Sequence, residues 1–150
     1  MLKQLNIPPV WTLGALVMVV FIAQFDPMPL LPLKAVAGLL IFVGLSLFFW
    51  STYWFKRKST TIVPRQKPQA LIFEGPFKIS RNPIYLAFIL IVEGAAFWMG
   101  SLLALIVPVW LFFFFEKNYV LPEERKMREG LGDAAVDAYF ARTGRWLWFL

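Results

Sequence analysis

Four long apolar stretches alternate along the chain with short segments rich in proline, glycine or charge. They predict helices over about residues 10–25, 33–55, 83–99 and 102–119. Each is close to the roughly 20 apolar residues that span the hydrocarbon core of a bilayer, although the first is a little short. Pro27, Pro29 and Pro32 separate the first two helices, and Gly100-Ser101 separates the last two. The pattern predicts an all-α integral membrane protein with about four transmembrane helices.

The last 30 residues predict further helices at the cytoplasmic side or the membrane interface. Leu121-Pro122-Glu123-Glu124 is typical of a helix start, with proline at the first position and acids in the first turn. Gly130 and Gly132 interrupt this helix, and Asp133 is a suitable N-cap for a last helix that ends near Thr143-Gly144. The following residues, Trp146 to Phe149, are apolar enough to lie on the membrane surface.

The chain is expected to form a single membrane domain over residues 1–150. Residues 1–55 hold the two N-terminal spans, and residues 56–150 form a core built from a helical hairpin and the C-terminal helices. In the second helix, small residues should let the backbone approach a neighbouring helix closely; they are Gly38, Gly44 and Ser46.

The cations predict the orientation of the spans. One group lies between helices two and three: Lys56, Arg57, Lys58, Arg65, Lys67, Lys78 and Arg81. A second group follows helix four: Lys117, Arg125, Lys126, Arg128, Arg142 and Arg145. The two turns on the opposite side hold only Lys34. By the positive-inside rule, both termini and the long middle loop are cytoplasmic, as expected for an inner or plasma membrane protein.

Composition excludes several kinds of chemistry. The chain has no cysteine and no histidine, which removes disulfides, thiolate nucleophiles and the commonest general base. Its nine acids do not cluster as a metal cage requires, so no metal site is expected. The net charge of +6 could indicate nucleic acid, but the cations border apolar spans. Anionic lipid headgroups explain these cations better.

The segment before the third helix has the features of a ligand site. Asn82 is a natural N-cap, Pro83 suits the first helical position, and Tyr85 falls on the first turn. Arg81 therefore stands beside the exposed amides of the helix start, where carboxylates and phosphates bind. Gly75-Pro76 permits a tight turn or a close approach of the backbone to a ligand. A capped helix whose arginine meets lipid phosphate explains the same residues equally well.

The C-terminal segment offers a second group of polar residues. Glu123 and Glu124 complement a helix dipole, so alone they are weak evidence for a site. The other candidates could be interfacial anchors or ligand contacts, and spacing does not decide; they are Tyr139, Arg142, Arg145 and Trp146.

Glu93 lies in the middle of the third helix, on the same stripe as Tyr85, Leu86 and Ile89. An ionisable group at that depth is costly and marks a possible functional position. It either stabilises helix packing, protonated or paired, or lines the pocket of a substrate.

Taken together, these segments resemble the isoprenylcysteine carboxyl methyltransferase family, its bacterial relatives and the related phospholipid N-methyltransferases. The resemblance covers about residues 60–146. It lies in a threonine-rich stretch with spaced prolines, Gly-Pro-aromatic at 75–77, Arg-Asn-Pro-x-Tyr at 81–85, the Glu-Glu pair and the terminal Arg-Trp.

The resemblance implies a methyltransferase that uses S-adenosylmethionine and acts on a lipophilic acceptor within the membrane. By position, the cofactor's amino-acid end would contact Gly75, Pro76, Arg81, Asn82, Pro83 and Tyr85. Glu123 and Glu124 would reach its ribose or cationic groups, Glu124 also acting in catalysis, with Tyr139 as a further cofactor contact. Arg142 would stand near the reacting acceptor, and Glu93, Arg145 and Trp146 would bind it.

A carboxylate oxygen is the favoured acceptor atom and an amine nitrogen the second. A carboxylate needs no general base, which suits a chain without histidine. Transfer from sulfonium to carboxylate also removes two charges, and a dry pocket favours that. Two other functions remain open: an NADPH-dependent membrane reductase of related architecture, and a membrane scaffold without catalysis.

Overall fold

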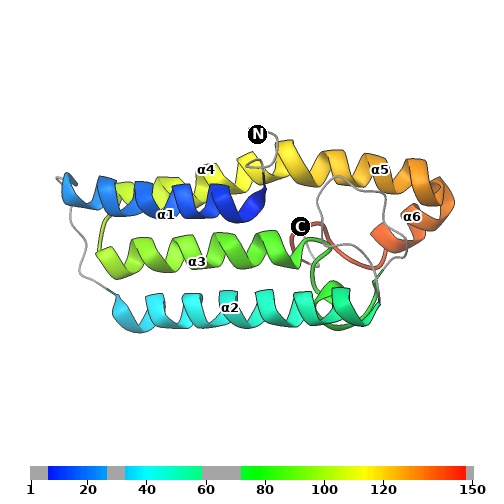
Figure 1. Cartoon of the computed structure of the whole chain (residues 1–150), viewed down its shortest axis with the longest axis horizontal. Helices are drawn as coiled ribbons and strands as arrows, with labels where there is room; N and C mark the ends of the chain where they lie inside the picture. Colours follow the sequence, from blue (N-terminus) through cyan, green and yellow to red (C-terminus); the bar gives the residue numbers. More distant parts are fainter. Residues whose placement is uncertain (1–6, 27–32, 59–71, 148–150) are drawn as a thin grey trace. The chain divides into compact units, whose positions relative to one another are not determined.

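The structure is a computed structural model that describes residues 7–26, 33–58 and 72–147 (Figure 1). All regular elements in these residues are helical. Outside them lie the prolines at 27, 29 and 32, the threonine- and proline-rich stretch 60–68, and Trp148-Phe149. The chain divides into two compact units, one of residues 1–46 and 87–114 and one of residues 47–86 and 115–150.

The predicted helices are close to those observed. The elements, in chain order, are α1 (Pro8–Gln24), α2 (Lys34–Arg57), η2 (Gly75–Lys78), α3 (Pro83–Met99), η3 (Leu103–Leu105), α4 (Ile106–Phe115), η4 (Glu116–Val120), α5 (Leu121–Leu131) and α6 (Asp133–Phe140). The bounds predicted for the third helix are confirmed, and those of the first two helices differ by no more than two residues. Pro83 explains the agreement at the start of α3, because the fixed φ of proline suits the first helical turn.

In the first unit, α2 and α3 approach closely through a reciprocal pair of glycines. A Cβ atom on Gly44 of α2 would lie 2.9 Å from the Ala87 carbonyl oxygen of α3. A Cβ on Gly94 of α3 would lie 2.9 Å from the Ala37 carbonyl oxygen of α2. The close approach predicted at Gly44 is confirmed. At Gly38 the prediction is wrong, because nothing lies within 4 Å of an added Cβ there.

The end of α1 is tied to the start of the last apolar helix. The Asp26 carboxylate accepts hydrogen bonds from the Ser101 hydroxyl and from the Leu103 N–H, the latter at 3.0 Å. Leu103 begins η3, so this carboxylate caps the amides of a helix start that is distant in sequence. At the other end of α1, the rings of Trp11 and Phe114 pack with their centroids 4.5 Å apart.

Large apolar side chains point outward along three helices of the first unit. Phe21 of α1, Phe42 of α2 and Ile106 of α4 are each more than 60% exposed. Soluble proteins rarely expose contiguous apolar surface of this kind, whereas lipid-facing helices do. Among the residues that the structure describes, two continuous helices, Lys34–Arg57 and Leu103–Leu131, are long and apolar enough to cross a membrane, and α1 and α3 are shorter apolar helices of 17 residues.

The α-helix α5 begins at Leu121 as predicted, with Pro122 and the two acids in its first turn, but it does not follow a break in the chain's helical structure. The helix runs without a break from α4 through the π-helical η4 into α5, and Val120 before Leu121 keeps helical dihedral angles. Pro122 would clash with the carbonyl group four residues earlier in a regular α-helix. The wider π turn immediately before Pro122 relieves this clash, as at other interruptions of the α-helical ladder.

The turn between α5 and α6 also differs from the prediction. Gly132, with φ +83°, stands at the N-cap position, and Asp133 is the first residue of α6 rather than its cap. Asp133 instead binds Arg128 at 3.1 Å, and the same guanidinium binds Asp137 at 2.8 Å. Gly130 lies within α5, and α6 ends at Phe140, earlier than predicted.

Candidate functional site

In the second unit, the C-terminal tail docks on the start of α3 (Figure 1). The Arg145 carbonyl accepts hydrogen bonds from the Asn82 amide at 3.0 Å and from the Ser80 hydroxyl at 3.4 Å. The Arg81 N–H donates to the Gly144 carbonyl at 3.0 Å. Asn82 and Pro83 open α3 as predicted, and two backbone carbonyls of the tail reach this helix start.

The turn at Gly75-Pro76 is fixed against the end of α2. Gly75 has φ +60°, and an added Cβ would lie 2.1 Å from the Trp54 indole nitrogen, so no other residue fits. Pro76 is buried, and the Phe77 ring packs edge-on against the Phe55 ring, with the two ring centroids 5.3 Å apart. These contacts pack the turn against the end of α2.

A surface ion pair closes the same turn. Lys58 binds the Glu74 carboxylate, and the hydrogen bond from Lys58 lowers the pKa of Glu74. Both side chains are more than a third exposed, so their attraction is screened by solvent. The pair therefore contributes less to the turn than the buried rings do.

Arg81 is the most buried cation of this unit among the residues in ion pairs. Its side chain is 9% exposed, and its Nη2 lies 3.1 Å from Glu124 Oε1. Its guanidinium stacks on the Phe140 ring at 3.6 Å from the centroid. Burial lowers the pKa of Arg81 while Glu124 opposes the shift, and an arginine remains charged in either case. Its Nε is buried and has no hydrogen-bond acceptor among the described residues.

Arg145 binds the same glutamate from the other side. Its Nε and Nη2 each lie 2.9 Å from a Glu124 oxygen, which is the bidentate geometry of strong arginine–carboxylate pairs. Its Nη1 lies 3.2 Å from Glu116. The hydrogen bond with Glu124 raises the pKa of Arg145. Glu124 is thus held between two guanidinium groups.

Glu123 is held by Tyr85. The Tyr85 hydroxyl donates to Glu123 Oε1 at 2.8 Å, which joins the first turn of α3 to α5. The Tyr85 ring lies against Phe115 and Tyr119, with centroids 5.3 and 5.9 Å away. The ring contacts fix the tyrosine, so its hydroxyl is positioned before any ligand arrives.

The other predicted site residues divide into buried and exposed ones. Tyr139 is 2% exposed, packs against Phe73 at 5.0 Å, and burial raises its pKa to about 12, so it is neutral at physiological pH. Trp146 is also buried. Arg142 is exposed and makes no side-chain hydrogen bond or ion pair within residues 7–26, 33–58 and 72–147. Its predicted place near the acceptor stays a prediction.

Glu93 belongs to the first unit. It is half-buried on α3, and its carboxylate has neither a hydrogen bond nor an ion pair with any residue that the structure describes. Its part in binding a substrate stays a prediction.

Sequence reasoning missed two residues of the cluster, Glu116 and Phe140. Glu116 precedes Glu124 by eight residues, which in a regular α-helix places the two about 80° apart around the axis. Only the π-helical segment brings both to Arg145. Phe140 follows Tyr139 in an apolar helix, and nothing in its spacing indicates that Arg81 stacks on it.

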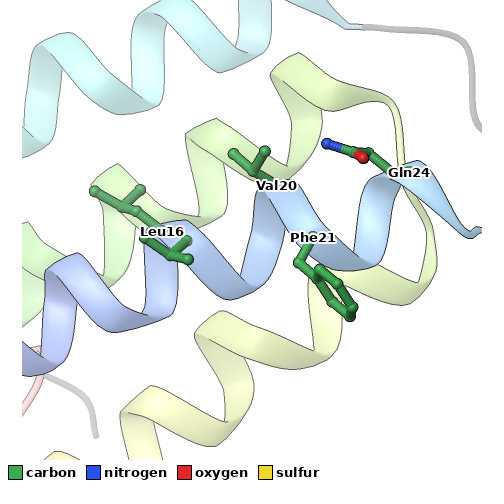
Figure 2. Close-up of a pocket in the computed structure, with 5 residues that line it drawn as sticks. Leu16, Val20, Phe21 and Gln24 are labelled. Carbon is green, nitrogen blue, oxygen red and sulfur yellow. The ribbon is translucent and has the colours of Figure 1, made fainter.

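A shallow groove of about 400 Å³ lies on the side of α1 (Figure 2). Its lining consists of Leu16, Val17, Val20, Phe21 and Gln24, all from this one helix. Because Gln24 is the only polar residue there, the groove lacks the charged groups of the cluster in the second unit.

The cluster combines two guanidinium groups with three carboxylates, Glu116, Glu123 and Glu124, without histidine or cysteine. Such a set can bind a small molecule that carries both a carboxylate and positive charge. Among the described residues, no three acidic side chains are placed to hold a metal ion.

The model of the phospholipid methyltransferase family matches residues 33–134, which extend from α2 to the start of α6. No curated protein and no solved structure matches the chain. The matched region contains Arg81, Tyr85 and the Glu123-Glu124 pair, whereas Tyr139, Arg142 and Arg145 lie beyond it.

Proposed function

Because the chain belongs to the phospholipid methyltransferase family, we propose that it transfers a methyl group from S-adenosylmethionine to a lipophilic acceptor in the membrane. The observation that carries this proposal is the buried Arg81 beside the start of α3. Its guanidinium has one nitrogen without an acceptor, and the glutamate pair of α5 lies next to it.

The residues fit the cofactor in charge and in hydrogen bonding. The buried Nε of Arg81 needs an acceptor, and a carboxylate supplies one. Glu124 and Glu123 offer acceptors for ribose hydroxyls or for cationic groups. S-adenosylmethionine, when bound, supplies a methyl group activated on a sulfonium. Arg81 would hold its carboxylate, and the two glutamates would hold the hydroxyls and positive charge.

The chain's own contribution to catalysis is orientation and exclusion of water. The aromatic rings around Tyr85 and the Phe140 ring under Arg81 make the walls of the cluster apolar. Holding two reactants in position and out of water accounts for much of the rate gain in transfers of this kind.

For the acceptor atom, we favour a carboxylate oxygen, as in the isoprenylcysteine carboxyl methyltransferases. The chain has no histidine or cysteine, Glu124 is paired with two arginines, and Tyr139 is held neutral. A carboxylate is already a nucleophile and needs no base. An amine nitrogen of a phospholipid is the second candidate, and the family match favours it.

We further propose that four helices span the membrane, with both termini and the 56–81 region on the cytoplasmic side of an inner or plasma membrane. The distribution of cations supports this orientation. Within the second unit, Arg142, Arg145 and Trp146 are proposed to face the acceptor, and Gly75, Pro76, Asn82, Pro83 and Tyr139 to line the cofactor. For Glu93, in the first unit, a part in choosing the acceptor is a separate proposal.

Calorimetry on the purified protein in detergent tests the cofactor. We expect binding of S-adenosylmethionine and none of NADPH. Binding of NADPH alone would support the reductase, which no comparison favours, and binding of neither would favour a scaffold.

The acceptor is tested separately. Lipid extracts are incubated with the protein and methyl-labelled S-adenosylmethionine, and the labelled products are treated with mild base. Esters release their label and methylamines keep it, so base-stable label would overturn the oxygen acceptor in favour of nitrogen.

A further inference from the structure

Arg145 divides its guanidinium between two carboxylates. Two of its nitrogens bind Glu124 at 2.9 Å, and the third binds Glu116 at 3.2 Å. Glu124 is only 13% exposed, whereas Glu116 is 25% exposed. The arginine therefore has a primary partner inside the cluster and a second partner closer to solvent.

The π-helical segment η4 creates this arrangement. In a regular α-helix, residues eight positions apart lie about 80° apart around the axis, since each residue turns about 100°. The i→i+5 turn of η4 takes up roughly one extra residue, which returns position 124 to within about 20° of position 116. Both carboxylates then face the same arginine. π-helical turns of this kind are frequent at functional sites.

The positive and negative charges around Arg145 are equal in number. Two guanidiniums, Arg81 and Arg145, face two carboxylates, Glu116 and Glu124. If a cationic ligand takes Glu124, Arg145 loses two hydrogen bonds while its side chain is still two-thirds buried. An arginine left there without a counter-charge would oppose binding. Glu116 is the carboxylate already in contact with it.

We infer that Glu116 is a positioning residue of the cofactor site, which keeps Arg145 paired when the cofactor engages Glu124. This role rests on the proposed function and acts through Arg145, without contact between Glu116 and the ligand. Because Glu116 stays bound to one edge of the Arg145 guanidinium, Glu124 can exchange Arg145 for the cofactor without leaving Arg145 unpaired.

The test is the affinity for S-adenosylmethionine of Glu116→Gln, measured by calorimetry. Glutamine keeps the size of the side chain and removes its charge. We expect the Kd to rise about fivefold or more, as for other closely coupled charge pairs. Glu116→Asp, which keeps the charge, should recover part of the affinity. Glu129→Gln is the matched control, because Glu129 is exposed on α5.

A second pair of variants separates positioning from support of the fold. In an Arg145→Gln background, Glu116→Gln should change the Kd less than twofold, because no guanidinium remains for Glu116 to hold. An equal loss in both backgrounds, or an unchanged Kd in the single variant, would overturn the inference. If the wild-type protein does not bind S-adenosylmethionine at all, the proposed function fails instead, so the two failures are distinguishable.

Discussion

At the scale of single residues, Arg81 has two contacts and one unsatisfied nitrogen that its position in the sequence did not predict. Its guanidinium stacks on Phe140, binds Glu124 and leaves Nε buried without an acceptor. Stacking on a ring and bidentate hydrogen bonding both require the planar guanidinium group of arginine, and the ammonium group of lysine provides neither.

Replacing Arg81 with lysine should therefore weaken S-adenosylmethionine binding by about tenfold or more, although the charge is kept. Calorimetry measures the loss, and thermal unfolding in detergent checks that the variant is folded. Arg125→Lys on the exposed side of α5 serves as the control. An affinity for the ligand equal to that of the wild type would remove Arg81 from the site.

Removing the Tyr85 hydroxyl isolates the hydrogen bond to Glu123, because phenylalanine keeps the ring contacts with Phe115 and Tyr119. Tyr85→Phe should lower the free energy of unfolding by about 1 kcal/mol, the usual size of one such bond. The cofactor Kd should rise about three- to tenfold, since Glu123 is no longer oriented.

The control for Tyr85→Phe is Tyr53→Phe. Tyr53 is exposed and its hydroxyl accepts a hydrogen bond from Arg57 at 3.0 Å. Its loss should change stability by less than about 0.5 kcal/mol. Equal effects of both substitutions would mean that the Tyr85–Glu123 bond has no special part in the site.

The sequence singled out residues near helix starts and missed those that depend on helix geometry or tertiary packing. Arg81 and Tyr85 were singled out by their place at the start of the third helix, and the Glu123-Glu124 pair by the family resemblance, because its position alone is weak evidence for a site. Glu116 was not singled out, since a regular helix would turn it away from Glu124. The pairing of Arg145 with Glu124, which lies 21 residues earlier in the chain, was not predicted, because no spacing rule indicates it. The part of Arg145 in binding the acceptor stays a prediction.

At the scale of elements, apolar length and proline placement predicted the helices well, and the junctions poorly. Pro83 opens α3 as expected, whereas Pro122 lies inside a continuous helix because a π turn accommodates it. Gly44 and Gly38 looked alike in the sequence. Only the packing of α2 on α3 distinguishes them, because Gly44 faces the Ala87 carbonyl and Gly38 faces open space.

This difference predicts opposite effects of one substitution. Gly44→Ala should destabilise the protein by about 1–3 kcal/mol, because a Cβ would meet backbone at 2.9 Å and force the helices apart. Gly38→Ala should be neutral or stabilise by up to about 1 kcal/mol, since alanine favours the helix. Unfolding temperatures in one detergent compare the two, and equal values would contradict the glycine contact.

At the scale of the whole molecule, the apolar exterior and the family both indicate a membrane-associated protein. In the described part of the chain, two helices are long enough to span a membrane, and the distribution of cations supports the proposal of four spans with a cytoplasmic middle region. Hydropathy alone predicted the all-helical fold, because a bilayer leaves the backbone few alternatives to a helix.

The absence of cysteine makes the orientation directly testable. Single-cysteine variants Lys34→Cys and Lys78→Cys, both at exposed positions, can be treated in intact cells with a maleimide that does not cross membranes. We expect labelling at position 34 and labelling at position 78 only after the cells are opened. The reverse pattern would invert the topology, and labelling of both in intact cells would contradict an odd number of crossings between them.

The contact of Asp26 with Ser101 and Leu103 has a consequence for biosynthesis. The two partners are 75 and 77 residues further along the chain. At translation speeds of about 5–20 residues per second, the first helix therefore waits roughly 4–15 s for them. A nascent chain arrested before Ser101 leaves Asp26 without these two donors. About two thirds of the chain must therefore be synthesised before the hydrogen bonds at the end of the first helix can form.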